Sequence, residues 1–284
     1  MTDINLFIEP DDLKLKINKN KNIKILDATF YLPDSGLNAE KEYNDKHITG
    51  AVFFDINKIA DPQNSLPHMI PSKEIFSEMM KNLGLNNDDE IIIYDNSSIL
   101  SSARAWFLLR YFNHNKIFIL KGGIKNWLKH NGSITSDLTV INKGNFTAQN
   151  EKKDLIKSLS NMIELSNKNG QLILDARSYN RYLGTAKEPR PGLPSGHIPN
   201  SKSLPSSDLI NKDGILKNEE ELKVIFNNNE ISQDDSIIAT CGSGVSACVI
   251  SLALFTLGKF DVPIYDGSWT EWASSGQSIA EGNN

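Results

Sequence analysis

The sequence of 284 residues contains only two cysteines, Cys241 and Cys248. Two cysteines are too few for the disulfide framework that holds small secreted domains together. The five histidines are dispersed, and none stands at ligand spacing from a cysteine, so the sequence does not indicate a zinc site. We therefore expect no metal ion, and if a cysteine serves the function, we expect it to act as a thiol.

Long apolar runs and an excess of positive charge are also absent. The longest apolar candidate, Val249 to Leu257, is interrupted by two hydroxyl residues and is shorter than the roughly 18 residues that a membrane helix needs. The net charge is −5, whereas nucleic-acid-binding proteins usually present a basic surface. Residues 1–20 have neither a secretory apolar core nor the acid-poor character of a transit peptide. We expect a soluble cytoplasmic protein that binds neither membranes nor nucleic acid.

The sequence does contain one long unit twice, with corresponding segments about 145 to 150 positions apart. The paired segments are 25–28 and 173–176, 47–51 and 197–201, 90–94 and 236–240, and 121–127 and 266–272. A chain of this length is long for a single core and suits two domains. We expect an N-terminal domain in residues 1–138, a polar linker in 139–153 and a C-terminal domain in 154–284.

Each half alternates short apolar strands with helical patterns. The predicted strands are 24–27, 90–94, 117–120, 172–175, 237–240 and 263–265, and the predicted helices are 72–83, 103–111, 218–226 and 246–257. Ser72 is the expected N-cap of the first of these helices. Strands that alternate with helices predict an α/β fold, in which each domain is a parallel sheet flanked by helices.

The most informative segment is the loop between the predicted strand ending at Thr240 and the predicted helix beginning near Ser246. It starts with Cys241 and contains Gly242 and Gly244, which permit a tight curl whose backbone N–H groups all point inward. Ligands of open α/β sheets bind beyond the carboxyl ends of the strands, where this loop lies. Inward amides at a helix N-terminus form an anion cradle and stabilise a thiolate, so Cys241 is the candidate nucleophile.

A single cysteine can instead be a small buried hydrophobic residue in a tight turn. The repeat favours the functional interpretation, because the corresponding residues 95–98 of the first half contain neither a thiol nor a glycine. One active domain and one supporting domain would follow. Cys248 falls inside the predicted helix, and we expect it to be packed rather than reactive.

These features together resemble the tandem rhodanese-fold sulfurtransferases, and specifically the 3-mercaptopyruvate sulfurtransferases. The resemblance extends over nearly the whole chain, with its motifs in the same order. They are residues 53–56 (FFDI) and 68–69 (HM) in the first half, and residues 175–177 (DAR), 181–182 (RY), 188–190 (EPR), 196–199 (GHIP), 241–245 (CGSGV) and 265–269 (YDGSW) in the second. The resemblance implies two tandem rhodanese-like domains, of which only the C-terminal one carries the nucleophile.

The resemblance also implies how the substrate is held. The implied substrate-binding residues are Arg181, Arg190, Gly242, Gly244, Val245 and Ser246. The planar fork of an arginine suits the carboxylate of a 2-oxo acid, although a loop arginine such as Arg190 would otherwise be interpreted as solvated. Thiosulfate-preferring relatives place basic residues directly after the cysteine. This chain has Gly242 and Ser243 there, the pattern of enzymes that use mercaptopyruvate.

A proton relay is implied less directly. A loop serine, a histidine and an acid of the first domain have been proposed to form it in the family, and Ser243 and His68 match the first two. The acid position falls on Asn57, which cannot ionise but can orient an imidazole by hydrogen bonding. Asp61 lies nearby in the sequence. The expected catalytic residues are Cys241, Ser243 and His68, whereas Arg177, His197, Asp266 and Trp272 are expected to serve the architecture.

The implied reaction is a double displacement without a cofactor. The Cys241 thiolate would take the sulfur of 3-mercaptopyruvate, pyruvate would leave, and the persulfide would pass its outer sulfur to thioredoxin, a small thiol or cyanide. A thiosulfate sulfurtransferase would differ only in the donor. A cysteine phosphatase would need an arginine where Ala247 stands. A non-catalytic persulfide carrier or binding module would load sulfur once without turnover.

Overall fold

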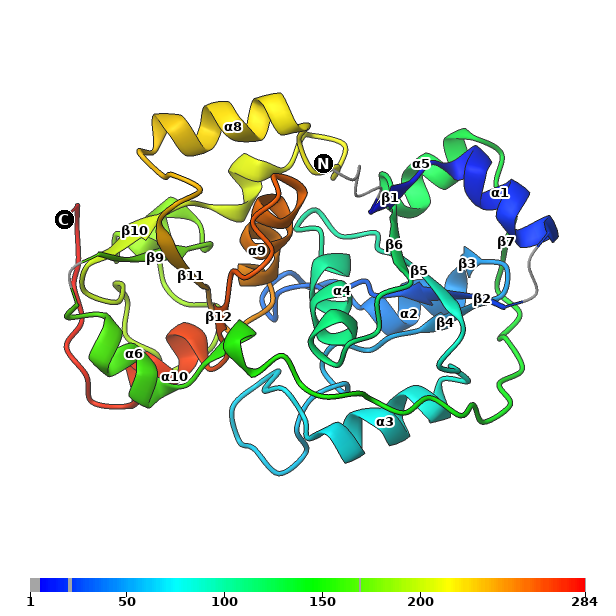
Figure 1. Cartoon of the computed structure of the whole chain (residues 1–284), viewed down its shortest axis with the longest axis horizontal. Coiled ribbons are helices and arrows are strands. Elements are labelled where there is room, and N and C mark those ends of the chain that lie inside the picture. The colour runs from blue at the N-terminus through cyan, green and yellow to red at the C-terminus, as the bar shows by residue number, and fades with distance from the viewer. Residues whose placement is uncertain (1–5, 20–21, 169, 284) are drawn as a thin grey trace.

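The structure, a computed structural model, describes residues 6–19, 22–168 and 170–283, so residues 1–5 and 20 of the N-terminal segment discussed above lie outside it. Two lobes are visible in Figure 1, each built on its own sheet. In spatial order, the first sheet consists of β1 (Phe7–Ile8), β6 (Ile117–Leu120), β5 (Glu90–Tyr94), β2 (Ile23–Asp27) and β4 (Ala51–Phe53). The second consists of β8 (Ile156–Lys157), β12 (Ile264–Tyr265), β11 (Ser236–Thr240), β9 (Gln171–Asp175) and β10 (Ser201–Ser203).

All strand pairs within these two sheets are parallel, and the two strand orders match one another. The structure therefore confirms the repeat and the α/β fold. A separate antiparallel pair joins β3 (His47–Ile48) to β7 (Ile134–Thr135), and the bridge between His197 and Ala280 is its counterpart in the second half.

Helices flank both sheets (Figure 1). The first lobe contains α1 (Pro10–Lys19), α2 (Ala39–Asp45), α3 (Lys73–Asn82), α4 (Ser102–Tyr111) and α5 (Gly123–Lys129). The second contains α6 (Leu159–Leu165), α7 (Tyr179–Tyr182), α8 (Glu219–Asn228), α9 (Ala247–Thr256) and α10 (Ser268–Ser274), with short 3-10 turns at Lys153–Leu155 and Ser206–Leu209. The predicted elements agree with these bounds to within two residues. Ser72 caps α3 as predicted, because its side chain accepts a hydrogen bond of 3.3 Å from the Ile75 amide.

Residues 139–152, within the predicted linker, contain neither helix nor strand, yet they are fastened to the first lobe. The Gly144 amide donates to the Lys81 carbonyl (2.9 Å), and the Phe146 amide donates to the Leu85 carbonyl (3.0 Å). The Phe146 side chain is buried in the same core as α3. The segment is thus an ordered strap rather than a free tether.

The two lobes meet at α4 and α9, which lie next to each other at the centre of Figure 1. Every residue of α4 is buried, and the rings of Trp106 and Phe255 pack edge to face with 5.1 Å between their centroids. Since α9 directly follows the Cys241 loop, this contact brings the loop against the first lobe. No helix in the described part of the chain is long and apolar enough to cross a membrane.

Candidate active site

Cys241 directly follows β11, and its side chain is buried. The carbonyl oxygens of the loop are held from outside by the start of α10. The Cys241 carbonyl accepts from the Trp269 amide (2.9 Å), and the Gly242 carbonyl accepts from the Thr270 amide (3.0 Å) and hydroxyl (2.7 Å). Fixing the carbonyls in this way leaves the amides for the interior of the loop.

The loop amides are divided between two uses. The amides of Cys241 and Gly244 donate to Ser268 Oγ at 3.2 and 3.1 Å, so these two are not available to a thiolate or a ligand. The remaining amides, those of Gly242, Ser243, Val245 and Ser246, have no hydrogen-bond acceptor within the described ranges. Four unpartnered N–H groups beside a thiol can stabilise a thiolate or a bound oxyanion. Ser268 Oγ itself lies 3.9 Å from Cys241 Sγ.

A buried arginine of the first lobe reaches into this loop. Arg104 Nη1 donates to the Gly244 carbonyl at 3.1 Å, and its Nη2 donates to the His68 carbonyl and lies 3.4 Å from Asp266 Oδ1. Asp266 Oδ2 accepts from the Ile70 amide at 2.8 Å. Arg104 was not among the residues predicted from the sequence, and Asp266 was expected to serve the architecture alone. The available signal was a charged residue inside an apolar helix, since arginine is rarely buried without a partner.

The side chain of His68 contacts the cysteine loop at Ser243. His68 Nδ1 lies 2.9 Å from Ser243 Oγ, and His68 Nε2 lies 3.0 Å from Asn57 Oδ1. An amide oxygen only accepts, so Nε2 carries the proton and Nδ1 accepts from the Ser243 hydroxyl. The Asp61 carboxylate instead accepts from the Gln63 amide, which leaves Asn57 in the place expected for the acid.

The imidazole of His68 is held neutral. Burial, together with the positive charges of Arg104 and Arg190, lowers its pKa to about 3, and only a hydrogen bond with the backbone of Ser243 opposes this shift. Asn57 offers no negative charge that would stabilise an imidazolium. His68 therefore carries one ring proton at neutral pH, on Nε2, and its Nδ1 is placed to orient the Ser243 hydroxyl.

The two predicted substrate arginines differ in their surroundings. Arg181 donates from Nε and Nη2 to the two carboxylate oxygens of Glu188, and its Nη2 lies close to the loop, 3.0 Å from where a Cβ on Gly242 would stand. Glu188 also binds Nη1 of the buried Arg177 at 2.9 Å. Arg177 in turn pairs with Asp175, so these two arginines and two carboxylates neutralise one another.

Arg190 differs from Arg177 and Arg181 because it forms no ion pair with the described residues. Within the described residues its guanidinium has neither a hydrogen-bond acceptor nor a carboxylate at ion-pair distance. Burial lowers its pKa, Cys241 opposes this shift, the neighbouring Arg181 adds to it, and Glu188 opposes it from beyond ion-pair distance. A partly buried guanidinium without an acceptor is suited to bind a carboxylate.

Two further expectations hold. Cys248 is fully buried and donates from Sγ to the Gly244 carbonyl (3.2 Å), and burial raises the pKa of its thiol to about 12, so it is packed and disfavoured as a thiolate. Arg177 is also fully buried, donates to the Gly196 carbonyl (2.8 Å) and stacks 4.5 Å from the centre of the Trp269 ring, as a structural residue would.

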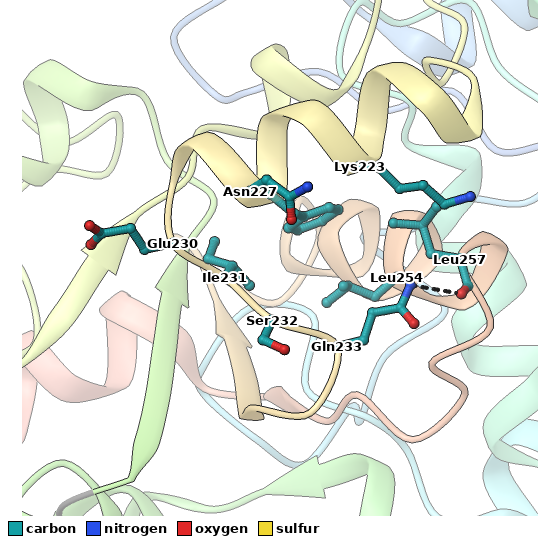
Figure 2. Close-up of a pocket in the computed structure, with 9 residues that line it drawn as sticks. Lys223, Asn227, Glu230, Ile231, Ser232, Gln233, Leu254 and Leu257 are labelled. Atoms are coloured by element: carbon teal, nitrogen blue, oxygen red, sulfur yellow. Dashed lines mark hydrogen bonds between the residues drawn. The ribbon is translucent and has the colours of Figure 1, made fainter.

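A cavity of about 520 Å³ lies between α8 and the last turn of α9 (Figure 2). Its walls include Lys223 and Asn227 of α8, and Leu254 and Leu257 at the end of α9. Cys241 precedes the opposite end of α9, so this cavity is not part of the thiol site.

Comparison with known proteins identifies relatives over nearly the whole chain. Residues 9–130 and 157–275 each match the Rhodanese-like domain. The chain is 37% identical over 265 residues to 3-mercaptopyruvate sulfurtransferase of Mus musculus, which covers 92% of this chain and 89% of the relative. It is 39% identical over 255 residues to thiosulfate sulfurtransferase of Mus musculus, with 88% and 85% covered.

A solved structure agrees with these matches. The crystal structure of SseA from Escherichia coli, described as a 3-mercaptopyruvate sulfotransferase, has a TM-score of 0.84 to this chain at 36% sequence identity. The alignment covers 93% of this chain and 99% of that one. Because a mercaptopyruvate enzyme and a thiosulfate enzyme are about equally identical to this chain, overall identity does not separate the two donors.

Proposed function

This chain belongs to the family of tandem rhodanese-domain sulfurtransferases, and from that premise we propose that it transfers sulfur from 3-mercaptopyruvate, through a persulfide on Cys241, to a thiol acceptor. The observation that supports this donor is the charge around Cys241. Loop residues 241–247 carry no charged side chain, and Arg190 is the one cation without an ion-pair partner among the described arginines near the thiol. A single positive charge suits a monoanion better than the doubly charged thiosulfate.

Arg190 would hold the carboxylate of 3-mercaptopyruvate, since its guanidinium has no competing acceptor within the described chain. Arg181 would play a smaller part, because Glu188 already occupies two of its donors. This arrangement presents the donor's sulfur to Cys241. The free amides of residues 242, 243, 245 and 246 would complete the pocket.

In the first step, the Cys241 thiolate attacks the sulfur of 3-mercaptopyruvate and forms an S–S bond. The bond between that sulfur and carbon breaks, and its electron pair leaves on the enolate of pyruvate. The enolate takes a proton to give pyruvate, and the sulfur remains on Cys241 as a persulfide. In the second step, an acceptor thiolate attacks the outer sulfur, and Cys241 leaves as the thiolate.

Ser243, His68 and Asn57 would act as a positioning unit in this scheme. The neutral His68 accepts a hydrogen bond from the Ser243 hydroxyl at Nδ1 and thereby fixes the orientation of that hydroxyl. A second proton on the His68 ring would create a third positive charge beside Arg104 and Arg190. Proton exchange with the donor thiol would therefore proceed through solvent or the persulfide rather than through an imidazolium.

We propose that residues 1–138 form the supporting domain, which supplies His68, Asn57 and Arg104. Residues 154–284 would form the catalytic domain, and residues 139–153 the connection. We further propose a cytoplasmic enzyme whose acceptor is thioredoxin or a small thiol. None of the proposed steps requires a cofactor.

The test is a single turnover followed by mass spectrometry of the intact protein. With 3-mercaptopyruvate and no acceptor, the wild type should gain one sulfur atom, and digestion should locate it on Cys241. The Cys241→Ser variant should gain none, whereas Cys248→Ser should load normally. Sulfur on Cys248 would refute the proposed nucleophile, and loading without later transfer to a thiol would favour the carrier alternative.

A further inference from the structure

A second cavity, of about 410 Å³, lies where the two lobes meet, away from the Cys241 loop. Its walls include Trp106 and Arg110 of α4, Phe255 of α9, Phe260 from the segment after α9, and Lys152 from the strap between the lobes. Arg110 and Phe255 lie in the last turns of their helices, whereas the thiol loop precedes the N-terminus of α9. The proposed sulfur transfer uses none of these side chains.

Arg110 is the unusual member of this cavity. Only 9% of it is exposed, and its guanidinium lies 4.8 Å from the centre of the Phe255 ring and 5.6 Å from that of Trp106. Nη2 donates to the Phe260 carbonyl, but Nη1 is buried without any hydrogen-bond partner in the described chain. Asp261 attracts the guanidinium from beyond ion-pair distance. A buried arginine without a carboxylate partner lowers the stability of the fold, because no ion pair offsets the free energy of removing its charge from water.

Two more nitrogen groups line the same space. Lys152 is partly buried and forms no ion pair or side-chain hydrogen bond with the described residues. Burial and the neighbouring Arg110 both lower the pKa of its ammonium group. His114 Nε2 is buried and likewise has no partner in the part of the chain that the structure describes. The cavity therefore combines aromatic walls with unpartnered nitrogens and no carboxylate among its lining residues.

We propose that this cavity binds a small organic oxyanion, in which an acidic group is attached to a flat apolar body. The acidic group would pair with Lys152 and supply the acceptor that Arg110 Nη1 lacks, and the apolar body would lie against the aromatic side chains. Nη1 is covered at present, so the ligand must displace a neighbouring side chain. Phe260 is 45% exposed and packs against the Phe255 ring with 5.0 Å between the ring centroids, so its ring is the one we expect to move aside. Such a ligand would bridge the lobes at a site separate from the sulfur donor.

The experiment is isothermal titration of the full-length protein with 2-naphthoate, and with the neutral 2-naphthamide as the matched probe. The active site also holds arginines, so the titration is repeated in Arg190→Met, where this cavity is unaltered. We expect one saturable naphthoate site that persists in Arg190→Met. Naphthamide should bind about tenfold more weakly, since a charge-assisted hydrogen bond is lost.

Variants then locate the site. Lys152→Met should weaken naphthoate binding about tenfold, and Arg110→Met should weaken it further. Lys223→Met is the matched control, because that lysine lines the cavity of Figure 2, and it should leave binding unchanged. If Arg110→Met does not fold, Lys152→Met and Phe260→Ala still test the site. The proposal is overturned if naphthoate binding is absent, if Arg190→Met abolishes it, or if Lys152→Met leaves it unchanged.

Discussion

Arg104 of the first lobe donates a hydrogen bond of 3.1 Å from Nη1 to the carbonyl oxygen of Gly244 in the second. Its other terminal nitrogen binds the His68 carbonyl and the Asp266 carboxylate. One buried cation thus holds both the cysteine loop and the histidine that meets it. The supporting lobe contributes to the site through this contact as much as through His68 itself.

Replacing Arg104 should therefore impair turnover more than donor binding. In Arg104→Lys the planar fork is lost, so the Gly244 and His68 carbonyls cannot both be bound. We expect kcat to fall about tenfold or more with little change in KM. Arg104→Met removes a positive charge and should therefore raise the pKa of His68. The same variant should lower the free energy of unfolding by about 3–5 kcal/mol, because the carboxylate of Asp266 is left buried without its partner.

Steady-state kinetics and an NMR titration of His68 separate positioning from a merely structural role. Full kcat in a folded Arg104→Lys variant would contradict the account.

The two substrate arginines should respond differently to the same change. Arg190→Lys should raise KM for 3-mercaptopyruvate about tenfold, because a point charge replaces an unoccupied fork. Arg181→Lys should have the smaller effect on KM, since Glu188 already engages that fork. Kinetics of the two variants, measured side by side, check the assignment. Equal effects, or a larger effect at Arg181, would mean that Glu188 releases Arg181 when the donor binds.

His68 should contribute little as an acid or base. General acid–base groups supply about 10²–10⁴-fold in rate, whereas we expect His68→Ala to cost less than about tenfold. With a pKa of about 3, His68 stays neutral over the working range, so the wild-type pH profile should show no inflection from it above pH 5. A loss of kcat of about a hundredfold or more in His68→Ala would contradict this prediction and would support a proton relay through His68.

Asn57→Asp provides the converse test. A carboxylate at the 3.0 Å contact with Nε2 would favour the imidazolium, so the pKa of His68 should rise by about one to three units. The measurement is the chemical shift of the His68 ring as a function of pH. An unchanged pKa would show that Asn57 does not face the imidazole in solution.

Gly244 tests the shape of the loop. It has a φ of 77°, and a Cβ there would stand 2.9 Å from the Asp266 carbonyl oxygen. Gly244→Ala should therefore distort the amide cradle and lower kcat about a hundredfold, the scale on which a misplaced catalytic donor acts. Gly258→Ala is the matched control: its φ is 92°, but a Cβ would meet nothing within 4 Å. The control should lose a little stability and keep its kcat, and equal losses of kcat in both would point to general strain.

The fold followed from the sequence because its determinants are local. The apolar run of residues 90–94 and the cap at Ser72 predict the elements that form there, and the repeat predicts that both sheets share one strand order. The short elements were missed. Strands such as β1 and β8 are two residues long, and they form only because the sheet provides a neighbour.

The site was predictable only in part, because several of its contacts join distant residues. The separation of 140 positions between Arg104 and Gly244 leaves no pattern in the sequence. Ser268 Oγ accepts hydrogen bonds from two loop amides, and the backbone of Ser268 has a φ of 50°, a conformation that serine rarely adopts. The role of Glu188, which neutralises Arg181, became clear only when the side chains were placed.

The most direct test of the account is steady-state turnover of the purified protein with 3-mercaptopyruvate and, separately, with thiosulfate, each with a thiol acceptor. Because Arg190 is the only cation without an ion-pair partner among the described arginines near Cys241, we predict a kcat/KM for 3-mercaptopyruvate at least about tenfold above that for thiosulfate. Equal or higher efficiency with thiosulfate would contradict the proposed donor, and would mean that charge around the thiol does not determine which substrate the enzyme uses.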